Sequence, residues 1–140
     1  MVVWVSRAVV VEIEDSEFQD NRGTAVRVAN IKDSLRLRGN VTFRNNQAQN
    51  GGALALVSTV VDFMPSSYIV FEDNHANDVG GAIFVESSST MYEENNPNTY
   101  VSCFYRFPEM NSDDNVRNLT FGNNSANRGG HGIFGGSLRR

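Results

Sequence analysis

A two-part motif recurs along this chain, and it constrains the fold more than any other feature of the sequence. Its first part, Phe-x-x-Asn, begins at Phe18, Phe43, Phe71 and Phe121, at intervals of 25, 28 and 50 residues. Its second part is a glycine pair that opens an apolar run, as in Gly80-Gly81-Ala82-Ile83. Repeats of this length, built from short apolar runs and turns, are typical of solenoids. We therefore expect a repeat architecture.

The phenylalanine, the asparagine and the glycine pair define each copy of the repeat. These residues are Phe18 and Asn21; Phe43, Asn46, Gly51 and Gly52; Phe71, Asn74, Gly80 and Gly81; and Phe121, Asn124, Gly129 and Gly130. The first copy has a single glycine before its apolar run, at Gly23, and the last copy carries one inserted residue, at Gly129-Gly130-His131-Gly132. We interpret all of these residues as structural.

Short runs of β-branched and aromatic residues lie between the motifs and predict strands. Ser34-Leu35-Arg36-Leu37-Arg38 alternates apolar and charged residues, the pattern of a half-buried strand. About three such strands fit in one repeat, so the sequence predicts an all-β fold, a parallel β-helix of the pectin-lyase-like type with about four to five coils. Residues 1–140 then form a single β-helix segment. We expect it to be an excerpt of a longer array, because the repeat is already under way at the first residue and still running at the last.

In a parallel β-helix, equivalent residues of successive coils stack about 4.8 Å apart. We therefore expect the repeat phenylalanines to form an aromatic stack and Leu54, Ile83 and Ile133 to form an aliphatic column. The repeat asparagines should form a ladder in which each side-chain amide donates to the next. The glycine pairs allow a positive φ and close backbone approach at the corner of each coil.

The regular pattern fails between Val85 and Leu119, and residues 86–118 are expected to form a longer, irregular loop region. The 50-residue interval could hold one coil with enlarged loops or two coils. We prefer one, because no Phe-x-x-Asn or Gly-Gly-Ala interrupts it. Tyr92, Tyr100 and Tyr105 could make recognition contacts there, and a variable spacer is an equal alternative. Cys103, the only cysteine, reads as a half-buried strand residue, or it pairs with a cysteine outside the segment.

The paired motifs resemble the repeats of the chlamydial polymorphic outer membrane protein family. The resemblance rests on Phe43 to Asn46 with Gly51 to Leu54, and on Phe71 to Asn74 with Gly80 to Ile83. It extends to the first and last copies but not to the irregular region. It implies right-handed β-helical domains displayed at a cell surface, with adhesive roles, so we expect a secreted or cell-surface location, although the segment itself shows no signal peptide.

Charge and short motifs add few functional indications. The net charge of −4, from 12 basic and 16 acidic residues, gives no electrostatic argument for binding nucleic acid. Asn40, Asn118 and Asn123 each begin an N-x-Ser/Thr pattern, which would permit N-glycosylation in a secreted protein.

Right-handed β-helices also carry polysaccharide lyases and hydrolases, which need clustered acidic residues. The carboxylates to consider are Glu12, Glu14, Asp15, Glu72 and Asp73, and we interpret them as solvated turn charges because the repeat register places no second carboxylate beside the last two. His75 and His131 occupy different repeat positions, the first read as a turn residue and the second as a corner residue. We expect no catalytic residues, no metal site and no cofactor.

The sequence thus predicts a non-enzymatic extracellular or cell-surface scaffold for adhesion or recognition. The alternative is a carbohydrate-active β-helix enzyme, either a polysaccharide lyase or a glycoside hydrolase, whose active site lies mostly outside this segment. The expected partners are glycans or surface proteins, not nucleic acid. End-to-end self-association is also expected, because exposed strand edges at the two ends of a coil can pair with another copy.

Overall fold

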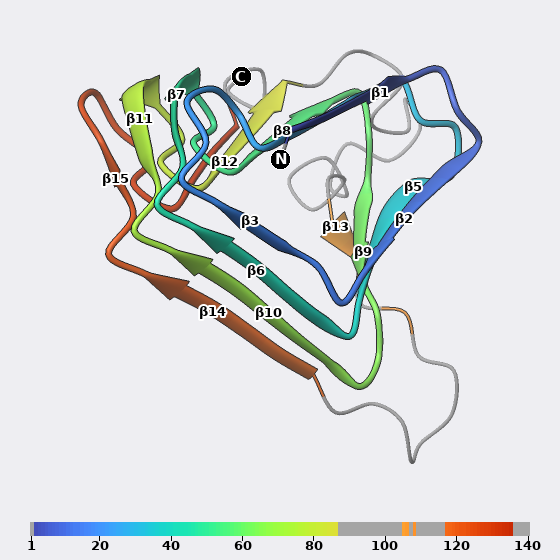
Figure 1. The fold of residues 1–140 in the computed structure, drawn as a ribbon. Helices are drawn as coiled ribbons and strands as arrows, with labels where there is room; N and C mark the ends of the chain where they lie inside the picture. The colour runs from blue at the N-terminus through green and yellow to red at the C-terminus, as the bar shows by residue number, and fades with distance from the viewer. Residues whose placement is uncertain (1, 87–104, 107, 109–116, 136–140) are drawn as a thin grey trace.

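The computed structural model describes residues 2–86, 105–106, 108 and 117–135. These residues form an all-β parallel β-helix, which confirms the predicted fold class (Figure 1). All pairings between the described strands are parallel. In Figure 1 the chain runs clockwise from β1 through β2 to β3, with the first coil nearest the viewer, so the winding is right-handed.

Each full coil contributes four short strands. The first coil holds β1 (Val3–Ser6), β2 (Val10–Glu14) and β3 (Glu17–Gln19). The second holds β4 (Val26–Ala29), β5 (Ser34–Arg38), β6 (Asn40–Arg44) and β7 (Gln47–Asn50). The third holds β8 (Leu54–Val57), β9 (Val61–Phe63), β10 (Ser67–Glu72) and β11 (His75–Val79). The fourth holds β12 (Ile83–Glu86), β13 (Tyr105–Arg106), β14 (Arg117–Gly122) and β15 (Ser125–Ala126), and β16 (Ile133–Gly135) begins a fifth.

Equivalent strands stack into four sheets, named A to D here. Sheet A is β1-β4-β8-β12-β16, sheet B is β2-β5-β9-β13, sheet C is β3-β6-β10-β14, and sheet D is β7-β11-β15. Sheets A, B and C form the sides of the triangular cross-section in Figure 1, and the short sheet D lies at the corner between C and A. The expectation of about three strands per coil was therefore too low, because the segments that follow the Phe-x-x-Asn motifs of Phe43, Phe71 and Phe121 contain the additional short strands β7, β11 and β15.

The irregular region belongs to one enlarged coil. β12 pairs directly with both β8 and β16, and β10 pairs directly with β14, so no further coil lies between them. Between β12 and β14 the structure describes one strand of this coil, β13, which pairs with β9. Residues 87–104 and 109–116 lie outside the described part of the chain, and the expectations for Tyr92, Tyr100 and Cys103 therefore stay predictions.

The phenylalanines of the repeat form a continuous aromatic stack inside sheet C. Ring centroids lie 5.1 Å apart for Phe18 and Phe43, 4.8 Å for Phe43 and Phe71, and 4.9 Å for Phe71 and Phe121, with interplanar angles of 10°, 3° and 7°. The first three rings are almost fully buried. In-register pairing makes this stack unavoidable, because Phe71 lies opposite both Phe43 and Phe121.

The repeat asparagines form the expected ladder immediately after the phenylalanine stack. The Nδ2 of Asn21 donates to the Oδ1 of Asn46 at 2.8 Å, that of Asn46 to Asn74 at 2.9 Å, and that of Asn74 to Asn124 at 3.0 Å. Each acceptor oxygen also receives the backbone N–H of the preceding asparagine in the ladder. The second amide hydrogen goes to the carbonyl of a phenylalanine, as from Asn74 to Phe43 at 3.0 Å. The buried amides of Asn46 and Asn74 are thus fully paired, as burial requires.

The glycine pairs form the corners between sheets D and A. The first glycine has a left-handed backbone in two pairs, with φ of 70° at Gly51 and 75° at Gly80, whereas in the last pair it is the second glycine, Gly130, with φ of 65°. The second glycine is needed for space, because a Cβ on Gly52 would lie 2.8 Å from the carbonyl oxygen of His75. Without these glycines the chain could not turn this tightly onto the coil below.

Candidate recognition surface

The residue before each ladder asparagine is a turn residue, and this position explains one of the considered carboxylates. Asp20, Asn45, Asp73 and Asn123 all have a left-handed backbone, with φ of 61°, 55°, 58° and 54°. Asp and Asn tolerate this conformation better than other non-glycine residues. Asp73 therefore has a conformational role that its equivalents in the other coils share.

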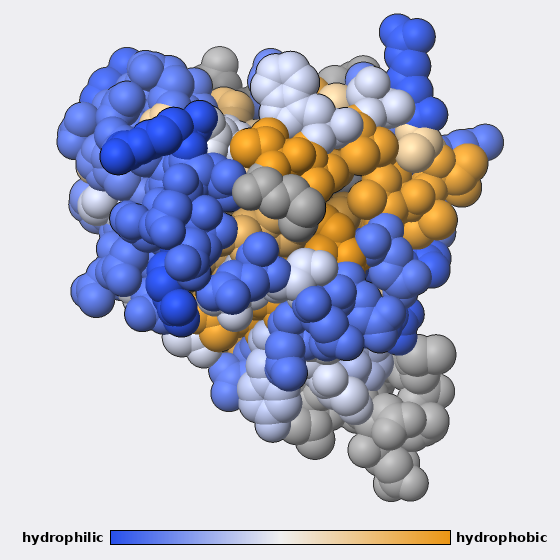
Figure 2. All heavy atoms as spheres, viewed as in Figure 1, coloured by the Kyte–Doolittle hydropathy of each residue, from blue (hydrophilic) through white to orange (hydrophobic). Residues whose placement is uncertain are grey.

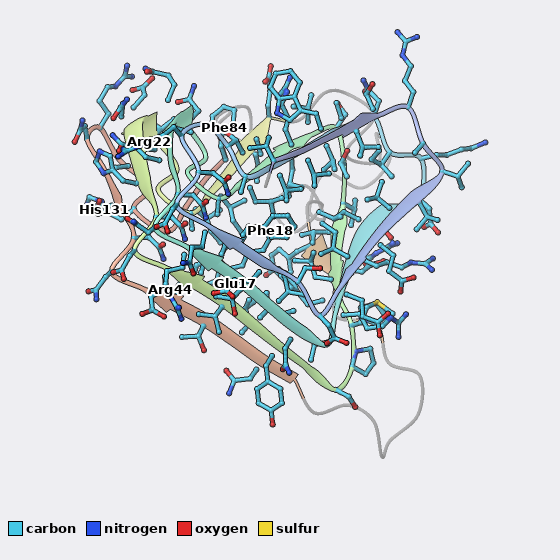
Figure 3. All side chains as sticks on the ribbon, viewed as in Figure 1. Glu17, Phe18, Arg22, Arg44, Phe84 and His131 are labelled. Carbon is cyan, nitrogen blue, oxygen red and sulfur yellow. The ribbon has the colours of Figure 1, made fainter. Side chains whose placement is uncertain are left out.

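Other considered carboxylates lie next to basic or backbone partners on the outer surface. Glu12 pairs with the Nε of Arg38 at 2.6 Å. Glu72 lies 3.7 Å from Arg44, which lies equally far from Glu17, and Figure 3 shows Glu17 and Arg44 projecting together from sheet C. Asp15 accepts the backbone N–H of Asn40 at 2.9 Å. Glu14, at the end of β2, is exposed. Glu12, Glu72 and Asp15 therefore belong to surface ion pairs or turns.

The two histidines have different hydrogen-bond partners, both on β15. The Nδ1 of His75 lies 2.8 Å from the hydroxyl oxygen of Ser125. The Nδ1 of His131 accepts the backbone N–H of Ala126 at 3.0 Å. His75 begins β11, so the expectation of a turn residue was wrong, whereas His131 lies at the corner as expected. The corner accommodates His131 as one extra residue: the backbone N–H of Gly81 donates to the carbonyl of Gly130, and that of the next residue, Ala82, donates to the carbonyl of Gly132. Among the described residues, no group of three or more His, Cys, Asp or Glu side chains could hold a metal ion.

Sheet B carries an outward row of alternating charge that the sequence did not reveal. Register places Glu12, Arg36, Asp62 and Arg106 side by side on β2, β5, β9 and β13. Asp62 is almost fully buried, and its two carboxylate oxygens accept hydrogen bonds from Arg106 at 2.7 and 2.9 Å. The hydrogen bonds to Asp62 raise the pKa of Arg106, and this effect exceeds the lowering that partial burial of the guanidinium causes. The pair attaches β13 of the enlarged coil to the regular coil below it.

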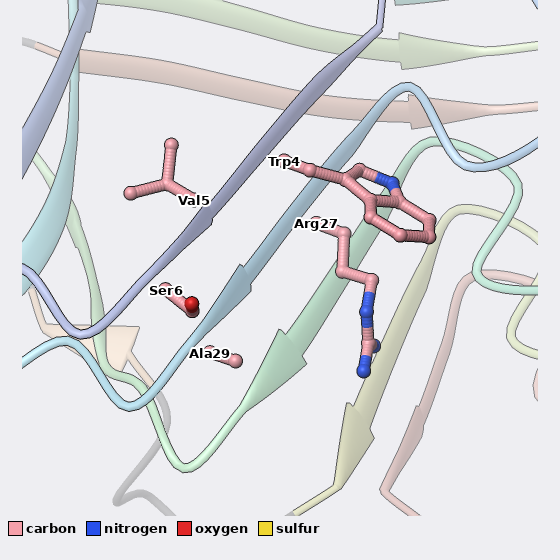
Figure 4. A pocket seen from close by; sticks show the side chains of 5 residues that line it. All are labelled: Trp4, Val5, Ser6, Arg27 and Ala29. Carbon is pink, nitrogen blue, oxygen red and sulfur yellow. The ribbon is translucent and has the colours of Figure 1, made fainter.

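The outward face of sheet A has a different character, because it presents an aromatic ring beside a small hollow. Trp4 on β1 and Arg27 on β4 are in register, as are Ser6 and Ala29. Trp4 is 73% exposed, and the guanidinium carbon of Arg27 lies 5.8 Å from its ring centroid, within the range of a cation–π contact. Figure 4 shows the two long side chains together and the two short ones farther along the same strands.

The hollow follows from this difference in side-chain size. Residues two apart on a strand point to the same face, so Trp4 and Ser6 share a face, as do Arg27 and Ala29. The long pair forms a wall and the short pair a floor, and Val5 completes the lining of a hollow of about 360 Å³. The row that begins with Trp4 and Arg27 continues through Ala55 to the half-buried Phe84 on β12.

The sequons occupy two kinds of position. Asn40 and Asn118 are exposed and lie on either side of Tyr68 in sheet C, in register with it. The hydroxyl of Thr120 donates to the Oδ1 of Asn118 at 2.9 Å. Asn123 is exposed too, but it is the left-handed turn residue of its coil. The part of the chain that the structure describes contains no helix long and apolar enough to cross a membrane.

Comparison with known proteins identified one family. The model of the Chlamydia polymorphic membrane protein repeat matches residues 40–56 and 68–86, which correspond to β6–β8 and β10–β12. No curated protein and no solved structure matches the chain. Each matched stretch contains one Phe-x-x-Asn and one glycine pair, so the family resemblance drawn from these motifs is confirmed. The repeat is that of a surface- or outer-membrane-associated family.

Proposed function

We propose that this segment, built on repeats of the Chlamydia polymorphic membrane protein type, is a non-enzymatic scaffold for adhesion or recognition at a cell surface or in the extracellular space. The observation that carries the proposal is the exposed Trp4 beside the hollow on sheet A. A ring that is 73% exposed adds little to the core, and aromatic and arginine side chains dominate binding at recognition surfaces. The stacked interior provides a rigid platform for this surface.

The lining of the hollow favours binding over catalysis. A glycosidase or a lyase would present a pair of acid and base groups to its substrate. None of the described residues that line the hollow, Trp4, Val5, Ser6, Arg27 and Ala29, carries a carboxylate. Glu72 is paired with Arg44, and Asp73 occupies a left-handed turn.

The outer positions of Asn40 and Asn118 are compatible with a secreted glycoprotein. Both are exposed at the beginning of a strand of sheet C, so a glycan attached there would extend away from the core. Expression through a eukaryotic secretory pathway tests this: we expect a mass decrease on treatment with peptide N-glycosidase that the double substitution of Asn40→Gln and Asn118→Gln abolishes. Asn123 should be glycosylated less, because the left-handed turn holds its backbone.

Self-association through the ends of the coil is the second proposed kind of contact. Val2, Val9 and Val10 of the first coil are 52%, 64% and 41% exposed, and Figure 2 shows apolar side chains gathered over this end. At the other end, Phe121 and Ile133 are 36% and 40% exposed although their equivalents one coil earlier are fully buried. Apolar strand edges of this kind favour pairing with another copy. Sedimentation of the 140-residue segment should therefore show concentration-dependent association.

The main test is a panel of glycans, polysaccharides and surface proteins, scored on the folded segment for both binding and release of product. Binding without product is the expected result. Product release that Glu72→Gln or Asp73→Asn abolishes would overturn the proposal in favour of an enzyme. A folded sample that binds no member of the panel would contradict the recognition role.

A further inference from the structure

Arg27 differs from five other arginines, because it has no carboxylate partner among the described residues. Arg36, Arg38, Arg44, Arg106 and Arg128 each lie within ion-pair distance of a carboxylate, at 2.8, 2.6, 3.7, 2.7 and 3.1 Å. Within the described ranges, Arg27 has no carboxylate at that distance. Its neighbours in register are Trp4 and Ala55. Its charge is therefore available to a ligand in the hollow.

The other walls of the hollow indicate what such a ligand looks like. The Trp4 indole offers a flat apolar surface, and the Ser6 side chain offers a hydroxyl that can donate or accept. A guanidinium matches the planar geometry of a carboxylate with two parallel hydrogen bonds. A pyranose ring has an apolar face, several hydroxyls and, in an acidic sugar, a carboxylate. The hollow of about 360 Å³ is at the small end of ligand sites, a size suited to one sugar ring.

We infer that the hollow between Trp4, Arg27, Ser6 and Ala29 binds one carboxylate-bearing sugar unit of an acidic glycan. The pyranose packs on the indole, the carboxylate pairs with the Arg27 guanidinium, and the short side chains of Ser6 and Ala29 leave room for the ring. This inference rests on the proposed recognition role and specifies its ligand class. The row from Arg27 through Ala55 to Phe84 gives neighbouring units of the same glycan a path across the coils.

The test uses two sources of the carboxylate and one matched neutral form of each. Oligogalacturonate carries the acid within the chain, and 3′-sialyllactose carries it on a terminal sugar. Their controls are the same galacturonate oligomer with its carboxylates reduced to alcohols, and lactose. Calorimetry on the folded segment should show binding of at least one acidic ligand at least tenfold tighter than its neutral control. The two arms show which source the site accepts.

Three variants connect the binding to the hollow. Arg27→Met should lower the affinity for the acidic ligand at least tenfold and abolish the preference for this ligand over its neutral control. Ala29→Leu should abolish binding of both the acidic ligand and its neutral control, because the larger side chain fills the bottom of the hollow and points away from the core. Arg22→Met is the matched control: Arg22 is an exposed arginine that donates to Gln47, away from the hollow, and its loss should leave affinity within twofold.

Equal affinity for acidic and neutral forms, or binding that survives Ala29→Leu, would overturn the inference. The same holds if no acidic or neutral sugar binds while a surface protein from the wider panel does, and that result would leave the recognition role standing. Failure of both the sugars and the wider panel would remove the recognition role as well, so the two failures can be distinguished.

Discussion

The inside and the outside of this coil follow different rules. Inside, the motif residues stack on the same residue type: phenylalanine on phenylalanine in sheet C, and asparagine on asparagine beside it. Outside, residues in the same register differ. One row of sheet B alternates in charge from Glu12 to Arg106, and one row of sheet A runs from Trp4 through Arg27 to Ala55.

The difference has a physical origin. An inward residue has a neighbour at the strand spacing above and below it and no access to water, so its partner must match in size and hydrogen bonding. An outward residue has solvent on one side, and its neighbours need only avoid repulsion. The interior therefore specifies the fold, and the outer rows are where a recognition site can form without cost to the coil. The following substitutions test this comparison.

The ladder should show the largest effect. Asn74→Leu leaves the side-chain amide and backbone N–H of Asn46 and the carbonyl of Phe43 without their partner in a buried site. At about 1–3 kcal/mol for each unsatisfied group, we expect a loss of about 3–5 kcal/mol in the free energy of unfolding, measured by urea denaturation. Asn77→Leu, at an exposed asparagine of the same coil, should change it by about 0.5 kcal/mol or less. An unchanged midpoint for Asn74→Leu would exclude the stacked ladder.

Substitution of a corner glycine should show the next largest effect on stability, and Gly122 at the end of β14 is its matched control. A Cβ on Gly81 would meet the carbonyl oxygen of His131 and lie 2.5 Å from that of Ser125, whereas a Cβ on Gly122 meets nothing within 4 Å. Neither glycine has a positive φ, so the contrast is purely steric. Gly81→Ala should cost about 2–4 kcal/mol, and Gly122→Ala should be neutral or stabilise by up to about 1 kcal/mol. Thermal unfolding of the two variants measures the difference, and equal melting temperatures would contradict the close packing at the corner.

The features that the sequence predicted well are those that repeat. The Phe-x-x-Asn motif fixes one inward column and one turn in every coil, so the aromatic stack and the ladder could be predicted before any strand was located. Sheet D was missed because β7 and β11 contain Gln-Ala-Gln-Asn and His-Ala-Asn-Asp-Val, which lack the β-branched pattern of a strand. They become strands because equivalent segments pair across coils, which local propensity does not capture.

The outer rows were harder to predict because they depend on the register between coils. Asp62 and Arg106 are 44 residues apart, Arg106 lies within the irregular region, and no repeat motif aligns the two. The hollow depends on two long and two short side chains that become neighbours only when β1 is aligned with β4. The only tryptophan of the chain, alternating outward in Val3-Trp4-Val5, was the available signal.

The ion pair of Asp62 and Arg106 combines an interior and a surface position, because the Asp62 side chain is buried and the Arg106 side chain is not. The Asp62 side chain is 5% exposed and that of Arg106 is 53% exposed. Arg106→Met strands a buried carboxylate and should cost about 2 kcal/mol, whereas Asp62→Asn leaves a solvated guanidinium and should cost about 1 kcal/mol. Urea denaturation of both variants gives the two values. The reverse order would mean that Asp62 is stabilised by groups other than Arg106.

The smallest effect on stability is expected at the proposed binding site. Arg27 contacts the exposed Trp4 ring, and an exposed cation–π contact contributes about 0.5–1 kcal/mol at most. Arg27→Met keeps a flexible apolar side chain over the indole, so the free energy of unfolding should change by about 0.5 kcal/mol or less. Urea denaturation measures this on the same protein that is used for ligand binding. A loss of about 2 kcal/mol or more would place Arg27 among the residues that hold the coil together. A stable variant that no longer distinguishes an acidic from a neutral sugar would instead show that this outer row serves binding alone, which is what separates the surface of the coil from its stacked interior.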